Sequence, residues 1–467
     1  MSRGDGPGAP ASAGDLDDVF AWIDAHEGEC VADLQELVRQ PSVSAQNVGL
    51  RACAQLVRTQ MRRDGLAAEL HEVEGGPPLV LGTMPSAASR KTMLCYAHYD
   101  VQPPEPIEAW THGGPWSAEI EDGVLYGRGA TDNKSGLLAF QKAAKAFLAV
   151  RGELPVGLTF FFEGEEEIGS LHLGPWVEKS ADLIRADGMH CLDGSLDTDT
   201  KLPDVDLGLK SVLFVELVAR GANADVHSLN FPLLPTPVWD LVRALGTILD
   251  EDRRIRIDGW YDGLYEPNEE DEAQVRAKAE RVDLGALKRD WGIDAFALGR
   301  DGAEAIRARA YEPTANIAGL IAGYTGPGSK TIVPNEARAK MDFRLVPHMD
   351  PSTAISKLRR HLDAHGFEAI EIVAEERAEP PYKISVREDM SRAVLAAAER
   401  VYGEPPIVNG VSAEGTIVKH VWIPCVLTGF ANPGANLHAP DENMRIRDYL
   451  QGIKYAAAIM AEFGAEG

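Results

Sequence analysis

Histidines and carboxylates of the kinds that bind transition metals follow several apolar runs in this sequence. The first pair, His98 and Asp100, comes directly after the apolar run 93–97. Side chains two positions apart in an extended segment face the same way, so Asp100 is placed to fix the orientation of the His98 ring. Ligands of open α/β sheets bind at the carboxyl ends of strands, where this pair is expected. Taken alone, such a pair is more often structural than catalytic.

A glycine-rich turn, GRGATDNKSG at 127–136, comes at the start of a predicted helix. A phosphate-binding loop requires glycine before the lysine and at the first position, but Asn133 precedes Lys134 and Arg128 stands at the first position. The turn therefore lacks the register of a phosphate-binding loop. It offers instead Asp132, a carboxylate at a helix N-terminus that is able to bridge two cations; a simple N-cap is the alternative role.

A dense group of carboxylates follows the apolar run 158–162, at Glu163, Glu165, Glu166 and Glu167. Their mutual repulsion costs several kcal/mol unless water or a cation lies close by. A solvated acidic loop is one interpretation. A metal site is favoured because a strongly apolar strand delivers the group to the sheet edge where the other candidates are expected.

Two more candidates, Asp193 and His438, complete the set of possible ligands. Asp193 follows the apolar run 189–192, and His438 lies in the segment GANLHAP at 434–440. Together the candidate segments provide two histidines and three carboxylates as ligands. This set is typical of a pair of zinc, manganese or cobalt ions, and it differs from the all-oxygen set of a calcium site.

Composition argues against several other classes of function. The formal net charge of -26 disfavours nucleic acid and membrane surfaces as partners, since binding of phosphate groups needs a basic surface. Residues 1–17 lack the basic start and the apolar stretch of a signal peptide and are expected to form a mobile tail. No run of about 18 apolar residues suits a membrane span. Five cysteines without CxxC spacing are expected to be reduced core residues, which together with these features indicates the cytoplasm.

The order of predicted elements indicates fold class. A helix is expected to begin at Asp17 or Asp18 and to end before Pro41, and strand-length apolar runs then alternate with helical spacings. Such alternation predicts an α/β domain with a mostly parallel sheet. The acidic segment 265–309, rich in Ala, Glu and Arg, is expected to be helical and to belong to a second domain.

The chain is too long for one core, so at least two domains are expected. The character of the sequence changes near residue 209 and strand-like apolar runs resume after residue 381. We therefore predict one domain made of residues 18–208 and 382–467, interrupted by an inserted domain of residues 209–381.

Four ordered motifs resemble those of the M20 metallopeptidases, particularly the carnosine dipeptidase-like branch. They are HYDVQP at 98–103, GRGATDNKSG at 127–136, EEEIGS at 165–170 and DFRLVP at 342–347. The resemblance extends from about Val31 to the C-terminus. It implies an α/β catalytic domain and an inserted α+β lid and dimerisation domain.

The resemblance also implies a ligand set, residue by residue. One metal would bind His98 and Asp193, a second would bind Glu167 and His438, and Asp132 would bridge the two. Zinc is the first choice of metal, with manganese or cobalt possible. In this family the peptide bond that follows the bridging aspartate is cis.

By the same similarity, Glu166 is the general base, and Asp100 supports catalysis by orienting His98. Two metals about 3.5–4 Å apart lower the pKa of a shared water. Glu166 would accept the proton of that water and later deliver it to the leaving amine. A shift of one residue, with Glu166 as ligand and Glu165 as base, stays open.

Substrate contacts can be carried over as well. They are His227, Thr331, Arg344, Gly415 and Thr416. His227 would stabilise the oxyanion, reaching the active site of a partner subunit in a homodimer. Arg344 would bind a substrate carboxylate, since guanidinium matches a carboxylate in a bidentate fashion. Dipeptidase relatives carry Arg-Glu-Gly-Gly-Ser where this chain has Ser-Ala-Glu-Gly-Thr at 412–416, which leaves substrate choice open.

The prediction is a metal-dependent exopeptidase that cleaves dipeptides or short peptides. The alternative within the same fold is hydrolysis of N-acyl or N-carbamoyl amino acids, which needs the same metals and base. A catalytically silent relative that only binds is a further alternative, and the complete set of candidate residues argues against it.

Overall fold

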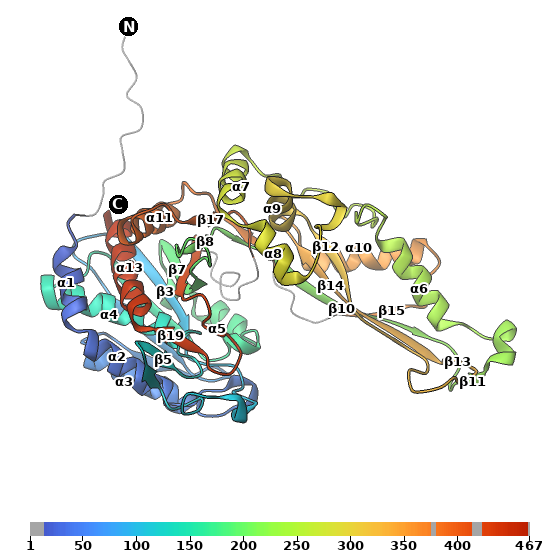
Figure 1. Ribbon diagram of the computed structural model, residues 1–467, viewed down its shortest axis with the longest axis horizontal. Helices are drawn as coiled ribbons and strands as arrows, with labels where there is room; N and C mark the ends of the chain where they lie inside the picture. The colour runs from blue at the N-terminus through green and yellow to red at the C-terminus, as the bar shows by residue number, and fades with distance from the viewer. Residues whose placement is uncertain (1–13, 375–379, 413–422, 466–467) are drawn as a thin grey trace, which may run out of the picture. The chain divides into compact units, whose positions relative to one another are not determined.

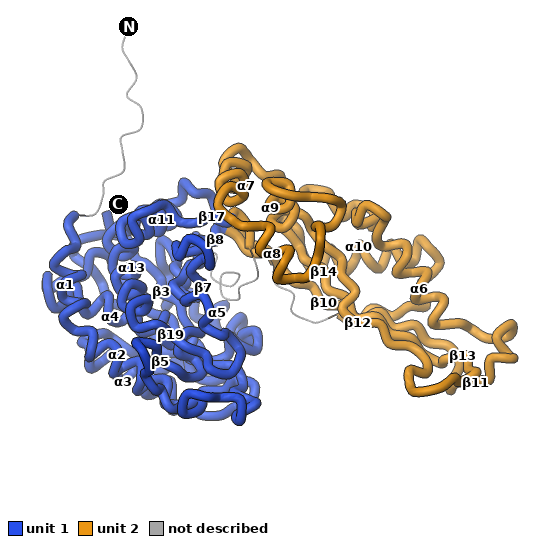
Figure 2. The backbone as a smooth tube through the Cα atoms, in the orientation of Figure 1, with its two compact units in different colours: residues 1–207, 384–409, 416–467 blue, residues 208–383, 410–415 orange. Residues whose placement is uncertain are grey.

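The computed structural model describes residues 14–374, 380–412 and 423–465. Two compact units are evident (Figure 2): the first comprises residues 1–207, 384–409 and 416–467, and the second comprises 208–383 and 410–415. Residues 410–412, which the prediction placed in the first domain, fall in the second unit. Ser412 connects them to it, since its N–H donates to the carbonyl oxygen of Gly208 and its carbonyl oxygen accepts from the N–H of Lys210. Residues 1–13, which make up most of the predicted tail, lie outside the described part of the chain.

An eight-stranded sheet forms the centre of the first unit. Its order is β1-β2-β6-β3-β7-β18-β8-β17, and the run from β6 to β18 is parallel. The strands are β1 (Glu69–His71), β2 (Leu79–Met84), β6 (Gly157–Glu163), β3 (Thr92–His98), β7 (Gly188–Ser195), β18 (Cys425–Ala431), β8 (Asp204–Asp206) and β17 (Ile407–Asn409). Strand β6 is buried along its whole length, as expected of a strand covered on both faces.

Helices cover both faces of this sheet. One face carries α1 (Asp17–Ala25), α2 (Glu27–Val38), α3 (Leu50–Arg63), α4 (Lys134–Arg151), α11 (Asp389–Tyr402) and α13 (Ile446–Ala465), with α4, α11 and α13 packed together (Figure 1). On the other face, Trp176 of α5 (Leu173–Ser180) packs against Phe161. The predicted first helix is two helices, because the chain breaks at His26, whose ring stacks on Trp22.

A small antiparallel sheet supports the loops next to the candidate site. It has the order β19-β5-β4, with β4 (Glu119–Glu121), β5 (Val124–Tyr126) and β19 (Asn443–Arg445). Strand β5 leads directly into the 127–136 turn, and β19 follows the loop that contains His438. The pairing of β5 with β19 therefore ties these two distant segments together.

The second unit has a four-stranded antiparallel sheet with helices on one face. The sheet order is β12 (Thr314–Ala322), β14 (Glu336–Leu345), β10 (Ser211–Arg220) and β15 (Glu371–Ala374). Alternate residues of β10, such as Leu213, Val215 and Leu217, point into a core shared with α6 (Pro237–Ile248) and α10 (Pro351–Ala364).

The remaining elements of the second unit are short strands and a helical subcluster. The predicted helical segment 265–309 forms α7 (Glu269–Arg281), α8 (Leu284–Trp291) and the start of α9 (Gly302–Tyr311). Strand β11 (Val226–His227) pairs with β13 (Ile332–Val333), and β9 (Gly208–Leu209) pairs with β16 (Tyr382–Lys383). The predicted α/β class with a mostly parallel sheet is confirmed.

Among the helices of the described residues, we find none with the length and apolar character of a membrane span.

Candidate active site

The five predicted metal ligands all lie in the first unit. His98 is the last residue of β3, Asp193 lies near the end of β7, and Glu167 follows β6. Since β6, β3 and β7 are adjacent and parallel, their carboxyl ends meet at one edge of the sheet. Asp132 and His438 reach this edge from the turn before α4 and from the loop after β18.

His98 is fully buried between carboxylates. Its Nε2 lies 3.1 Å from Oδ1 of Asp132 and 3.5 Å from Oδ2 of Asp193. On the other side of the ring, Nδ1 lies 3.1 Å from the carbonyl oxygen of Asp100. Nε2 has no hydrogen bond of good geometry within the described residues. A metal ion would give this buried nitrogen a partner, while Asp100 fixes the ring.

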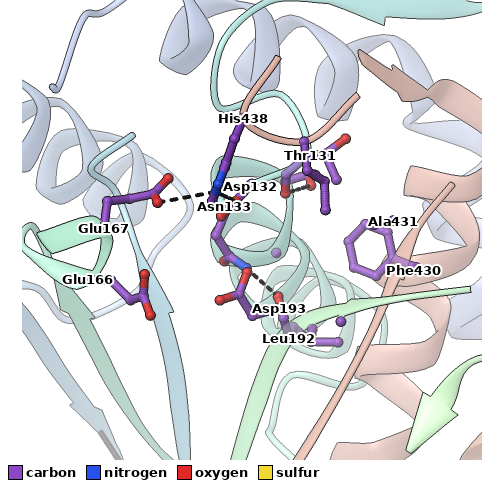
Figure 3. A pocket seen from close by; sticks show the side chains of 14 residues that line it. Thr131, Asp132, Asn133, Glu166, Glu167, Leu192, Asp193, Phe430, Ala431 and His438 are labelled. Atoms are coloured by element: carbon purple, nitrogen blue, oxygen red, sulfur yellow. Dashed lines mark hydrogen bonds and ion pairs between the residues drawn. The ribbon is translucent and has the colours of Figure 1, made fainter. Parts of the chain in front are cut away.

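Asp132 contacts both His98 and His438, and its position next to His438 is visible in Figure 3. Its Oδ2 lies 2.9 Å from Nε2 of His438, while its Oδ1 faces His98. Burial alone would raise the pKa of Asp132, but its hydrogen bond with His438 and its close contact with the His98 ring outweigh burial and hold that pKa well below its usual range. The carboxylate is therefore charged, with each oxygen directed at a different imidazole, which is the arrangement that a bridging ligand requires.

Glu167 contacts both His438 and Gln102. Its Oε2 lies 3.3 Å from Nε2 of His438 and accepts a hydrogen bond from the Gln102 side chain at 2.9 Å. Its backbone N–H, like that of Glu166, donates to the Asp100 carboxylate, at 3.1 and 3.2 Å. Potential ligand atoms of His98, Asp132 and Glu167 lie within 4.8 Å of one another. These nitrogen and oxygen donors suit zinc, manganese or cobalt.

The other two glutamates of the run have different surroundings. Glu165 is turned toward His172, whose backbone N–H donates to Oε2 of Glu165 at 3.2 Å. Glu166 lines the same cavity as the candidate ligands. Burial raises the pKa of Glu166 to about 8, which suits a group that exchanges protons near neutral pH.

The cavity has a volume of about 200 Å³ and a partly apolar lining. Leu192, Phe430 and Leu437 supply the apolar part of its lining, beside the carboxylates of Asp132, Glu166, Glu167 and Asp193 and the imidazole of His438. Such a small space accommodates a reacting group and displaces much of the water around it, which strengthens the electrostatic interactions inside.

Comparison with known proteins decides the family. The model of the peptidase family M20/M25/M40 matches residues 94–462. The chain belongs to this family. It is 28% identical to the Beta-Ala-His dipeptidase of Homo sapiens, over 96% of this chain and 92% of that one. It is also 28% identical to the Cys-Gly metallodipeptidase DUG1 of Saccharomyces cerevisiae, over 95% and 97%.

A solved M20 structure is similar along the same length. The M20 family metallo-carboxypeptidase Sso-CP2 from Sulfolobus solfataricus superposes with a TM-score of 0.84 at 35% identity and covers 93% of this chain and 99% of that one. The predicted membership of the M20 family is thus confirmed, and the protein is a metallohydrolase.

The lysine of the turn at 127–136 is engaged with the backbone of the first unit. The ammonium group of Lys134 is buried and donates to the carbonyl oxygens of Leu37 and Gln40. The peptide bond between Asp132 and Asn133 is cis, as the family resemblance implied. The Asn133 amide donates to the carbonyl oxygen of Leu192 and to the carboxylate of Asp193.

The predicted substrate contacts lie in the second unit or outside the described residues. His227 and Thr331 come together through the β11–β13 pair, with 3.4 Å between Nε2 and Oγ1. Arg344 lies on β14, paired in register with Val212 and Thr314. Gly415 and Thr416 fall outside the described part of the chain.

Two residues that contact the candidate site, Gln102 and Glu442, were not predicted from the sequence. Gln102 holds Glu167, and the fully buried Glu442 accepts hydrogen bonds from the turn that carries Asp132. Gln102 is part of the HYDVQP motif, and Glu442 follows His438 by four positions. Proximity in sequence to a candidate ligand was the available signal for both.

Proposed function

We propose that this metallohydrolase is a two-metal exopeptidase that cleaves the amide bond of dipeptides or short peptides. The observation that carries the proposal is the position of Asp132, with one carboxylate oxygen directed at His98 and the other at His438. A carboxylate shared in this way supports two neighbouring cations. The dipeptidase names of the two relatives and their coverage of nearly the whole chain support a dipeptide substrate.

The proposed ligand assignment follows the contacts. His98 and Asp193 would hold one ion, Glu167 and His438 the other, and Asp132 both. Zinc is the first choice, and manganese or cobalt accept the same donors. When bound, the ions lower the pKa of a water and polarise the carbonyl group of the substrate.

Residues of the chain supply the proton transfers and the positioning. Glu166, which lines the cavity, would accept a proton from the attacking water and return it to the leaving amine. Asp100 would keep the His98 ring and the 166–167 backbone in place through its hydrogen bonds.

Substrate binding is assigned to the second unit. Arg344 would bind the terminal carboxylate of the peptide, and His227, beside Thr331, would donate to the oxyanion. Gly415 and Thr416 are proposed as further contacts. His227 is exposed on its own unit, which is compatible with a role in the active site of a partner subunit and hence with a homodimer.

A substrate panel tests the proposal. The purified, metal-loaded enzyme would be assayed with dipeptides, N-acetyl amino acids and N-carbamoyl amino acids, before and after treatment with a chelator. We expect hydrolysis of dipeptides that chelation abolishes and metal addition restores. Preference for the N-acyl or N-carbamoyl compounds would replace the dipeptidase assignment, and no metal-dependent hydrolysis of any compound would indicate a silent relative.

Mixing two inactive variants tests the shared site. A His227→Ala subunit retains Glu166, and a Glu166→Gln subunit retains His227. If His227 acts across a dimer, subunits unfolded and refolded together will regain activity that neither variant shows alone. Absence of recovery in a mixture that forms dimers would place His227 in its own subunit's site.

A cytoplasmic location is part of the proposal. All five cysteines are buried and unpaired, as is usual for proteins of a reducing compartment.

A further inference from the structure

We propose that Glu442 is a positioning residue that holds the Asp132 turn and the His438 loop in one arrangement and thereby sets the affinity of the metal site. The inference rests on the proposed function and deepens it, because it names a residue outside the ligand set on which metal binding depends.

The Glu442 carboxylate is fully buried and accepts four hydrogen bonds. Its Oε2 accepts from Nη1 of Arg128 at 2.7 Å and from the backbone N–H of Gly129 at 3.0 Å. Its Oε1 accepts from the backbone N–H groups of Thr131 and Asp132, both at 3.1 Å. The carboxylate therefore fixes the backbone of the residue that is proposed to bridge the metals.

Further bonds join the same two segments around this carboxylate. The Gly127 N–H donates to the Glu442 carbonyl oxygen at 2.8 Å, and the Thr131 hydroxyl donates to the Asn443 carbonyl oxygen at 2.6 Å. The β5–β19 pair continues the connection. These bonds hold the part of the turn from Gly127 to Asp132, and the Glu442 carboxylate lies at the centre of the bonded group.

The neighbours of Glu442 in sequence, Asp441 and Asn443, hold the loop that contains His438. The Asp441 carboxylate accepts from the N–H and hydroxyl of Thr111, at 2.8 and 2.7 Å. The Asn443 N–H closes the loop by donating to the Ala435 carbonyl oxygen at 2.9 Å. Because His438 lies inside this closed loop, a displacement of Glu442 would shift His438 relative to Asp132.

The contribution of the buried Arg128–Glu442 ion pair to stability does not by itself explain why a charged pair is present here. Arg128 and Glu442 are both almost inaccessible to solvent, with side-chain exposures of 1% each. Replacing such a pair by apolar residues often leaves a protein as stable or more stable. A carboxylate, however, offers two acceptor oxygens in one plane, which an apolar residue or an amide cannot provide to four N–H donors. Directional control of the turn is therefore the function that fits.

Metal affinity measured by chelator competition tests the inference independently of any peptide substrate. Glu442→Gln keeps the size of the side chain but replaces one acceptor by a donor that faces N–H groups. We expect its metal dissociation constant to rise about 10- to 100-fold, as is usual for residues that orient ligands. Arg128→Lys, which keeps a cation beside the carboxylate, should show a smaller rise. Thermal unfolding of the metal-free variants establishes that they fold.

Two control variants separate the possible failures. Glu462→Gln removes the charge from another buried glutamate of the first unit, paired with Arg400 at 2.7 Å, and should bind metal as the unmodified protein does. Asp132→Asn should lose metal. If Asp132→Asn binds metal normally, the proposed metal site is wrong. If Asp132→Asn loses metal while folded Glu442→Gln and Arg128→Lys bind it within twofold of the unmodified protein, the positioning role is wrong. Failure of both variants to fold would also overturn it, since the pair would then serve the fold.

Discussion

Oε1 of Glu165 lies 2.9 Å from Nδ1 of His172, and neither residue lines the cavity that contains Glu166 and Glu167. This contact bears on the register of the three glutamates, since a shift of one residue would make Glu166 the ligand and Glu165 the base. With Glu165 engaged by His172, the two glutamates that line the cavity are Glu166 and Glu167. The geometry therefore favours Glu166 as base and Glu167 as ligand.

Substitution of neighbouring glutamates separates the two registers. We expect Glu166→Gln to lower kcat by about 10²- to 10⁴-fold, the usual contribution of a general base, with metal content unchanged. Glu165→Gln should retain most of the activity because its contact with His172 is structural. Steady-state kinetics and metal analysis of both proteins provide the measurement. A large loss in Glu165→Gln beside an active Glu166→Gln would establish the shifted register.

Asp100 connects the ring of His98 to the 166–167 backbone, so its charge should matter for metal binding. Asp100→Asn keeps the shape of the side chain but removes its charge. It should weaken the hydrogen bonds that the carboxylate accepts from the N–H groups of Glu166 and Glu167, and its contact with the His98 ring. We expect about a 10- to 100-fold loss in metal affinity or kcat. Zinc titration and kinetics at saturating metal distinguish the two effects. Unchanged values in both would show that backbone contacts alone orient His98.

A second acidic group, formed by Glu29, Asp33 and Asp64, contains possible metal ligands, but lysines occupy it. Nζ of the fully buried Lys142 lies 2.5 Å from Asp64 and in contact with Asp33. Lys142→Met would leave these carboxylates buried without this partner, and we expect a loss of about 3–5 kcal/mol in the free energy of unfolding.

Urea denaturation measures this loss, and Lys454→Met is the matched control. Lys454 pairs with Asp24 at 2.6 Å at a more exposed position, so its removal should cost at most about 1 kcal/mol. Equal losses in the two variants would contradict the expected importance of the Lys142 pair.

Glu163 predicts a pH dependence of stability. Burial raises its pKa to about 7 from the model-compound value of 4.5, although the Tyr96 hydroxyl donates to it at 2.6 Å. The folded state therefore holds this proton more tightly than the unfolded state. The resulting stabilisation is complete below pH 4.5 and is lost as the pH rises through about 7.

In the metal-free protein, this residue should lower the free energy of unfolding by about 3 kcal/mol across that interval. Urea denaturation at several pH values would show a flatter profile for Glu163→Gln than for the unmodified protein. Tyr96→Phe, which removes the hydroxyl that lowers this pKa, should steepen the profile. Identical slopes in all three proteins would mean that Glu163 does not titrate in this range.

The catalytic strands were readable from sequence because both faces of their sheet are covered. The apolar runs at 93–97 and 158–162 lie within β3 and β6, and polar residues directly after them lie at the sheet edge. The break at His26 was not predicted. The apolar spacing continues across it, and no sequence pattern marks the break at His26, where the ring stacks on Trp22.

Long-range contacts account for what sequence patterns left out. Glu442 is 310 residues from Asp132, whose N–H it accepts, and no periodicity or composition links the two positions. Residues 410–412 likewise join the second unit through Ser412, which forms hydrogen bonds with Gly208 and Lys210, about two hundred residues earlier. Contacts between residues this far apart in the sequence depend on the complete fold, so they can be identified only from the three-dimensional structure.

The place of β18 in the large sheet has a consequence for biosynthesis. This strand comes from residues 425–431, yet it lies between β7 and β8, and α13, the last helix, packs against α4. A growing chain on the ribosome therefore lacks a central strand of this sheet until the whole inserted unit and residues 425–431 have been made, although domains usually fold as units in order of synthesis. His438 emerges later still, so a nascent chain cannot assemble a complete active centre before the inserted unit has been translated.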